Sequence, residues 1–279
     1  MRPSAGAVAP KRGEAESAAD ALSDAIATLF ERLRQRRPRI HCMTNNVAQA
    51  FTANVLLAAG AVPSMSIAPE EIEAFVGRAG ALLVNLGTFD AERRAGLPLA
   101  LEAAAKARIP VVLDPVLIEA SPGRLALALE ILRGKPAVIR LNTAELAALA
   151  GAAPDRTGVC RLARETGAVI ALTGEADLVS DGARLVTIRN GHSLMAQVTA
   201  MGCAAGALIA AALACAGDAL TAAAAGLGAL GIAGEIAGET ARGPGSFAVG
   251  ILDALAGLDA ETLARRARLD LAAARETSS

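Results

Sequence analysis

The stretch Val198-Thr199-Ala200-Met201-Gly202-Cys203 runs directly into the apolar segment Ala204–Leu213 and decides how the rest of the chain can be placed. Its β-branched residues predict an extended approach, its small residues predict a turn, and the apolar segment predicts a long helix. The first turn of such a helix presents unpaired backbone N–H groups and the positive end of the helix dipole, which together favour an anion. The same field tends to lower the pKa of a thiol, here that of Cys203. An anion site beside a candidate base suggests phosphoryl transfer.

The composition argues against a nucleic-acid partner. The 279 residues carry 27 Lys and Arg against 28 Asp and Glu, a net charge of −1, so there is no basic excess. With 2% aromatic residues, the chain also has few side chains on which single-stranded bases could stack. We therefore expect no nucleic acid among its partners, and a core built from Ala, Leu, Val and Ile.

The cysteines and the N-terminus point to a reducing compartment. The cysteines lack the paired spacing of a zinc site, which favours a cytoplasmic protein; they are Cys42, Cys160, Cys203 and Cys215. The N-terminal residues have no apolar signal-peptide core, so residues 1–12 are predicted to be a flexible leader and residues 13–279 a single domain. The Ala-rich run 203–217 is shorter than a membrane span requires, so we interpret it as a buried helix and expect no membrane contact.

Upstream of the focal stretch, apolar strands alternate with helices. This pattern predicts an α/β fold with a mostly parallel central sheet and helices on both faces. The Asp181-Gly182 turn between short strands predicts an antiparallel hairpin at the sheet edge. The predicted strands are 39–43, 61–67, 81–86, 109–113, 137–140 and 168–172, and the predicted helices are 14–36, 47–59, 69–78, 90–107, 121–133, 143–150, 204–213, 220–242, 247–257 and 260–275.

Polar residues recur where the predicted parallel strands end, and this edge of an open α/β sheet carries the ligand site. Asp114 follows one strand, and Asn142-Thr143-Ala144-Glu145 follows the next. Carboxylates placed there can hold Mg²⁺ directly or through water. Both segments also have purely structural interpretations, since an aspartate can cap a helix and Asn142 with Glu145 resembles a capping box. Their coincidence at one edge, near an anion-binding helix start, favours a metal–phosphate site.

Two further strand ends leave alternatives open. Arg140 either faces a phosphate or marks the point where its strand emerges into solvent. Thr173-Gly174 either offers a hydroxyl and a close backbone approach to a nucleotide or forms an ordinary turn. His192, in a polar turn, is not expected to be catalytic.

Taken in chain order, the motifs resemble those of the hydroxyethylthiazole kinase family, the thiamin-salvage member of the ribokinase-like fold. Each motif alone is weak, whereas the ordered set, over roughly residues 25–258, is specific. The matching segments are His41–Asn45, Phe51–Asn54, Met65 with Ala68–Glu71, Asn85–Thr88, Pro110–Val116, Lys135–Arg140 with Asn142 and Glu145, Leu172–Glu175, Asn190–His192, Gly202-Cys203 and Gly243–Phe247.

The resemblance implies a ribokinase-like three-layer sandwich that phosphorylates the primary alcohol of 4-methyl-5-(2-hydroxyethyl)thiazole, with ATP as co-substrate and Mg²⁺ as cofactor. It implies that Cys203 stands where most ribokinase-like enzymes carry a base aspartate, and that the protein is a homotrimer with sites between subunits. Residue by residue, it implies that Met65, Asn45 and Ala200 bind the alcohol, that Arg140 and Thr173 bind ATP, that Asp114 and Glu145 organise the metal, and that Gly202 and Cys203 form the catalytic turn.

The chain departs from the family pattern at the focal turn. The usual Gly-Thr-Gly-Cys is replaced by Ala200-Met201-Gly202-Cys203, and alanine is unfavourable where the backbone needs a positive φ. Leu117 likewise stands in a segment that is usually Gly-rich. Three interpretations therefore stay open: an active thiazole-alcohol kinase, a kinase for another small alcohol, and a catalytically weak paralogue that binds or regulates. The retained acidic, guanidinium and thiol side chains favour an enzyme.

Overall fold

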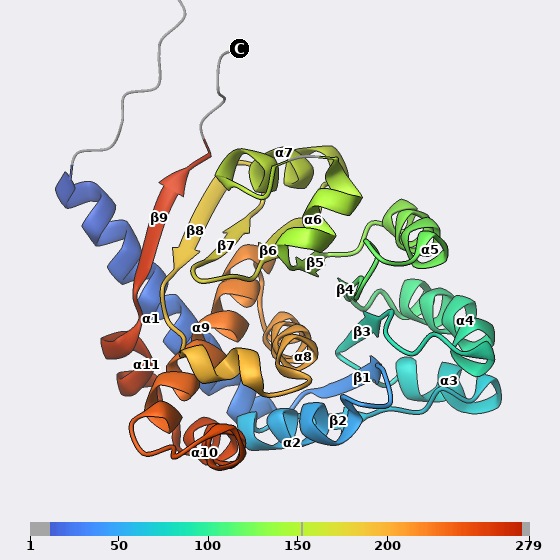
Figure 1. The fold of residues 1–279 in the computed structure, drawn as a ribbon, viewed down its shortest axis with the longest axis horizontal. Helices are drawn as coiled ribbons and strands as arrows, with labels where there is room; N and C mark the ends of the chain where they lie inside the picture. The colour runs from blue at the N-terminus through green and yellow to red at the C-terminus, as the bar shows by residue number, and fades with distance from the viewer. Residues whose placement is uncertain (1–11, 152, 275–279) are drawn as a thin grey trace, which may run out of the picture.

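A single sheet organises the molecule. The computed structural model describes residues 12–151 and 153–274, and within them nine strands lie in the order β2-β1-β3-β4-β5-β6-β7-β8-β9 (Figure 1). Neighbouring strands are parallel from β2 to β6 and antiparallel from β6 to β9. The strands are β1 (Arg39–Met43), β2 (Val62–Ser64), β3 (Ala81–Asn85), β4 (Val111–Asp114), β5 (Val138–Leu141), β6 (Val169–Leu172), β7 (Asp177–Ser180), β8 (Arg184–Ile188) and β9 (Leu269–Ala273). The predicted mostly parallel α/β sheet is confirmed.

Helices cover both faces of the sheet and make three layers (Figure 1). The larger hydrophobic cluster lies under α1 (Arg12–Arg36), α2 (Gln49–Ala59), α8 (Met201–Leu213), α9 (Ala219–Gly238), α10 (Pro244–Gly257) and α11 (Ala260–Arg266). The second cluster lies under α3 (Pro69–Val76), α4 (Ala91–Ala107), α5 (Pro122–Arg133), α6 (Thr143–Ala150) and α7 (Arg156–Thr166). Burial of apolar side chains on both faces explains why the parallel strands carry almost uninterrupted hydrophobic sequence.

The packing of α8 on α9 depends on small residues. Gly226 of α9 approaches α8 so closely that a Cβ atom there would lie 2.7 Å from the backbone nitrogen of Ile209. Within the part of the chain that the structure describes, α9 is the helix that is long and apolar enough to cross a membrane by length and composition. Most of its apolar window is buried inside the fold, which is typical of a core helix.

The structure corrects the prediction in three places. Residues 269–273 form strand β9, paired with β8, whereas a helix was expected over 260–275. The 3-10 helix Ser193–Gln197 precedes the focal turn, so only Val198 is extended where a strand-like approach was expected. Helix α7 was not predicted, although Val159, Leu162 and Ala163 lie buried on one face at helical spacing; its sequence is mostly polar and carries few large apolar side chains. The predicted leader, residues 1–12, lies outside the described residues except for Arg12, where α1 begins.

Candidate active site

The carboxyl ends of the central parallel strands meet the start of α8. Asn85 ends β3 and stands in register with Asp114, which ends β4. Arg140 lies in β5, and Thr173 follows β6 directly. Since all of these strands point the same way, their polar ends converge on one edge, as the sequence predicted.

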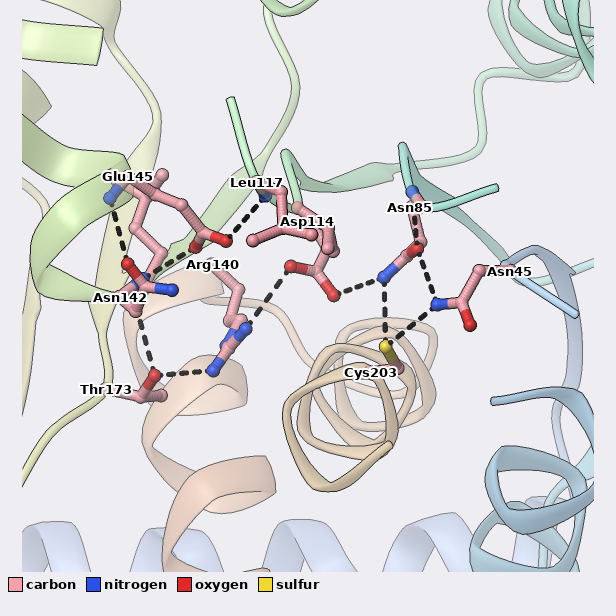
Figure 2. Close-up of polar contacts among 12 residues, drawn as sticks. Asn45, Asn85, Asp114, Leu117, Arg140, Asn142, Glu145, Thr173 and Cys203 are labelled. Carbon is pink, nitrogen blue, oxygen red and sulfur yellow. Dashed lines mark hydrogen bonds and ion pairs between the residues drawn. The ribbon is translucent and has the colours of Figure 1, made fainter. Parts of the chain in front are cut away.

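A chain of polar contacts runs along this edge (Figure 2). The amide Nδ2 of Asn45 donates to Oδ1 of Asn85 at 3.1 Å, and Nδ2 of Asn85 donates to Oδ2 of Asp114 at 2.6 Å. Nη1 of Arg140 lies 3.3 Å from Oδ1 of Asp114, and Nη2 donates to the hydroxyl of Thr173 at 2.6 Å. These hydrogen bonds join residues predicted for the alcohol, the metal and ATP into one network.

The thiol of Cys203 receives two amide donors from this network. Nδ2 of Asn45 lies 3.2 Å from Sγ, and Nδ2 of Asn85 lies 3.3 Å from it (Figure 2). Burial, reinforced by the negative charge of Asp114, raises the pKa of the Cys203 thiol to about 11, although the two amides and Arg140 oppose this rise. The expectation that the helix start lowers this pKa is therefore wrong, because burial and the charge of Asp114 raise it.

The backbone of the focal turn is held in an unusual conformation. Ala200 has φ 68° and ψ 2°, in the left-handed region, and no side chain caps the N-terminus of α8. The positive φ that makes alanine unfavourable is therefore present at this position. Thr88 and Leu117, in two other loops of the site, also have positive φ values of 44° and 58°. Non-glycine residues in this region are strained. Three more among the described residues, Arg37, Arg108 and Lys135, follow the ends of helices α1, α4 and α5.

Gly202 leaves the space that Arg140 fills. A Cβ atom on Gly202 would lie 2.7 Å from both Nη1 and Nη2 of Arg140. The guanidinium therefore rests on the backbone of the first turn of α8. Burial opposes the charge of Arg140, but the nearby carboxylates of Asp114 and Glu145 outweigh it and raise the pKa of the guanidinium.

A cavity of about 630 Å³ opens on the Arg140 side of this turn, a size that suits a small ligand. Its polar wall includes Arg140, Thr173 and Asn190, while Leu227 and Leu230 of α9 supply part of its apolar wall. The cavity brings together the two residues predicted for ATP. Its lining also includes Met201 and Gly202 of the focal turn.

The alcohol-side residues lie elsewhere. Asn45 and Cys203 are in contact with each other but are not part of the cavity lining. Met65 follows β2, is half-buried against the larger hydrophobic cluster, and does not line the cavity either. The cavity therefore holds the residues predicted for ATP, whereas the amide contacts of Cys203 lie just outside its lining, next to Gly202 in the chain.

Comparison with known proteins agrees with this geometry. The model of the hydroxyethylthiazole kinase family matches residues 30–261. A hydroxyethylthiazole kinase from Granulibacter bethesdensis is 44% identical over 260 residues, which cover 88% of this chain and 95% of that relative. This chain belongs to the hydroxyethylthiazole kinase family.

Solved structures of similar proteins establish the fold. The hydroxyethylthiazole kinase protein from Pyrococcus horikoshii superposes with a TM-score of 0.84 at 37% identity, covering 88% of this chain and 98% of that one. A ribokinase-like superfamily protein from Enterococcus faecalis superposes with a TM-score of 0.61 at 14% identity, covering 80% of this chain and 88% of that one. The ribokinase-like three-layer sandwich inferred from the sequence is confirmed.

The two carboxylates predicted for the metal are close to Arg140 but are already bonded to protein groups. Glu145 accepts the backbone N–H of Leu117 at 3.1 Å and that of Asn142 at 2.8 Å, so the capping-box interpretation is confirmed. Burial raises the pKa of both acids, and the charge of Asp114 raises that of Glu145 further.

Asp114 and Glu145 fit a hydrated metal ion better than a metal site in which protein side chains supply all the ligands. In residues 12–151 and 153–274, no group of three His, Cys, Asp or Glu side chains is arranged to hold a metal ion. Magnesium commonly keeps several waters and binds through one or two carboxylates and the substrate phosphates. A cation beside Asp114 and Glu145 would also favour their charged forms against burial and would offset the charge of Asp114, which raises the pKa of Glu145.

Two residues that line the cavity, Asp177 and His192, are not predicted from the sequence as site residues. Burial raises the pKa of Asp177 to about 6, and its carboxylate accepts the backbone N–H of Gly174 at 3.0 Å in the cavity wall. Its position just after the Thr173-Gly174 turn was the available signal. His192 lines the cavity but caps the following 3-10 helix through Nδ1 and packs on Phe247. This structural role agrees with the expectation that His192 is not catalytic.

Replacing Ala200 by glycine is expected to stabilise the protein by about 0.5–1 kcal/mol, because glycine adopts the left-handed conformation without steric cost. The greater conformational entropy of glycine in the unfolded chain offsets only part of this gain. Urea unfolding of the two proteins measures the difference. Ala105→Gly on the exposed face of α4 is the matched control and is expected to destabilise by about 1 kcal/mol. Destabilisation by both substitutions would contradict the assignment of strain to Ala200.

Proposed function

We propose that the protein transfers the γ-phosphoryl group of ATP to the primary hydroxyl of 4-methyl-5-(2-hydroxyethyl)thiazole, in thiamin biosynthesis or salvage. The observation that carries this proposal is that two neighbours in α8 serve different groups: Gly202 lines the cavity, and Cys203 receives the amide contacts. The cavity, of about 630 Å³, also contains Arg140 and Thr173. Two amide groups converge on the thiol of Cys203.

The nucleotide side suits a polyphosphate. In the part of the chain that the structure describes, Nε of Arg140 is buried without a hydrogen-bond partner, so this donor is available to a phosphate oxygen. The uncapped N-terminus of α8 adds backbone N–H groups and the positive end of its dipole. Phosphoryl transfer depends mainly on positioning and charge neutralisation, which these groups supply.

The alcohol side supplies a proton acceptor. The hydroxyl oxygen attacks the γ-phosphorus, the bond from that phosphorus to the bridging oxygen of ADP breaks, and the hydroxyl proton passes to the thiolate of Cys203. Near neutral pH the thiolate is a minor form, because the pKa of the thiol is raised to about 11. We therefore propose a slow reaction whose rate follows the thiolate fraction.

Asp114 and Glu145 are the residues we propose to hold Mg²⁺, through water, beside the phosphates. The ion would neutralise phosphate charge that Arg140 alone does not balance. Ala200, Asn45 and Met65 are the residues we propose for the alcohol, by resemblance to the family. Of these, Asn45 is supported directly by its contact with Cys203 at 3.2 Å.

We also propose a cytoplasmic homotrimer with sites between subunits. Three exposed apolar side chains support a subunit contact. Val47 lies just before α2, Leu57 lies on α2, and Val249 lies on α10, which packs against α2. Their exposed fractions are 69%, 58% and 61%. Association would bury apolar surface of this kind.

The test is ADP release by the purified protein with ATP and Mg²⁺ and a panel of primary alcohols. The thiazole alcohol is expected to give the highest kcat/KM. If another alcohol turns over and the thiazole does not, the protein is a kinase of a different acceptor. If the thiazole binds and no alcohol in the panel turns over, the protein is a binding or regulatory paralogue, and the proposed activity is wrong.

A further inference from the structure

We propose that two buried side chains, Arg93 and His41, are positioning residues for the alcohol side of the site, because each bonds to both neighbours of a residue predicted to contact the alcohol. Arg93 holds the neighbours of Asn45, and His41 holds the neighbours of Met65. The inference rests on the proposed function for the identity of the alcohol.

Arg93 lies in the first turn of α4 and is 1% exposed. Its Nε donates to the backbone carbonyl of Thr44 at 3.0 Å, and its Nη2 donates to Oδ1 of Asn46 at 2.6 Å. Nη1 pairs with Asp90 at 2.5 Å, so the buried charge has a counter-ion. A buried guanidinium with three fixed partners has little freedom, and it fixes the loop that lies on either side of Asn45.

The amide of Asn45 has several constraints of its own. Its Oδ1 accepts the backbone N–H of Ala48 at 3.0 Å, and its Nδ2 faces Cys203 and Asn85. Gly87 closes the remaining side, since a Cβ atom there would lie 2.8 Å from Cβ of Asn45. A shift of the loop would therefore move the amide relative to the thiol rather than be absorbed by side-chain rotation.

His41 bonds in the same way to the two residues on either side of Met65, Ser64 and Ser66. The ring is fully buried in β1, with Nδ1 2.9 Å from Oγ of Ser64 and Nε2 3.0 Å from the backbone carbonyl of Ser66. Because a carbonyl only accepts, Nε2 carries the hydrogen and Nδ1 accepts from the Ser64 hydroxyl. Burial lowers the pKa of His41 to about 4, so this neutral form persists at neutral pH. Phe75 stacks on the ring at 6.0 Å and limits its rotation.

Both residues serve the same half of the site. Neither Arg93 nor His41 lines the nucleotide-sized cavity, and neither contacts Arg140 or Thr173 in the described residues. Loss of either side chain should therefore loosen the alcohol contacts while the ATP contacts keep their geometry. Small displacements of positioning groups can cost a large part of the rate.

The test compares Arg93→Met and His41→Phe with the wild-type protein. Both variants are expected to raise KM for the alcohol about tenfold and to leave KM for ATP within about twofold. Titration of the alcohol in the absence of ATP should show the same weakening in Kd. Arg93→Lys and His41→Gln, which keep part of the hydrogen bonding, should recover part of the loss. Arg94→Met, on the exposed face of α4, is the matched control and should match the wild type.

Equal rises in both KM values, or an unchanged KM for the alcohol in folded variants, would overturn the positioning role. If Arg93→Met does not fold, Asn46→Ala removes only one of the three bonds and tests the same point at an exposed position. The wild-type assay separates this outcome from failure of the proposed function. If the wild type uses another alcohol, the KM comparison is made with that alcohol.

Discussion

Cys203→Ala is expected to lower kcat by about tenfold or more, whereas Cys203→Asp is expected to keep or raise it. The thiol is held between two amide donors at 3.2 and 3.3 Å, and we propose that it accepts the hydroxyl proton there. Alanine removes the proton acceptor. A carboxylate in the same place is ionised near neutral pH to a far greater extent than a thiol whose pKa is about 11.

The pH dependence of kcat distinguishes the wild-type thiol from the carboxylate of Cys203→Asp. Since the raised pKa of Cys203 leaves the thiolate scarce below pH 9, the wild-type kcat should rise about tenfold per pH unit between pH 6.5 and 9. Cys203→Asp should be nearly independent of pH in that range, because its carboxylate is already ionised. ADP release at saturating ATP and alcohol measures both profiles.

Cys215→Ala is the control for loss of a buried cysteine, since Cys215 lies just beyond the far end of α8. It should retain the wild-type kcat and pH profile. Equal activity in the wild type and in Cys203→Ala would exclude the thiol as proton acceptor. A pH-independent wild-type profile would have the same consequence for the thiolate.

Arg140→Met is expected to lower kcat/KM for ATP by about a hundredfold and to destabilise the fold by roughly 3 kcal/mol. The guanidinium lies 3.3 Å from the fully buried carboxylate of Asp114 and 2.6 Å from the hydroxyl of Thr173. Its loss removes the more buried of the two arginines in the cavity lining, Arg140 and Arg189, and leaves Asp114 buried without a counter-ion. Steady-state kinetics and urea unfolding measure the two effects separately.

Arg140→Lys should fall between the wild type and Arg140→Met, because lysine keeps the charge but not the planar set of donors. Arg161→Met breaks an exposed ion pair with Glu165 and provides the control; it should cost no more than about 0.5 kcal/mol and leave the kinetics unchanged. A normal KM for ATP in Arg140→Met would show that the guanidinium serves only the fold.

Much of the fold follows from local patterns. Uninterrupted apolar strands separated by helices predict the parallel sheet, since such strands are stable only when both faces are covered. The same reasoning places Asp114, Arg140 and Thr173 at one edge, because parallel strands end on the same side. Strand β9 was missed because a short apolar segment such as Leu269–Ala273 is ambiguous until its partner β8 is known.

The turn at Val198–Cys203 shows what the sequence determined and what only the tertiary structure decided. The sequence located a helix start with a thiol in its first turn, and it marked Ala200 as unfavourable if the backbone there has a positive φ. Only the folded chain showed that φ is 68° and that the pKa of Cys203 rises to about 11. The position of a helix start, and therefore of its dipole, can be predicted from residues that are adjacent in the sequence. Burial and the charge of Asp114, by contrast, depend on how the chain folds, since Asp114 ends a strand about ninety residues away in the sequence, and together they raise this pKa.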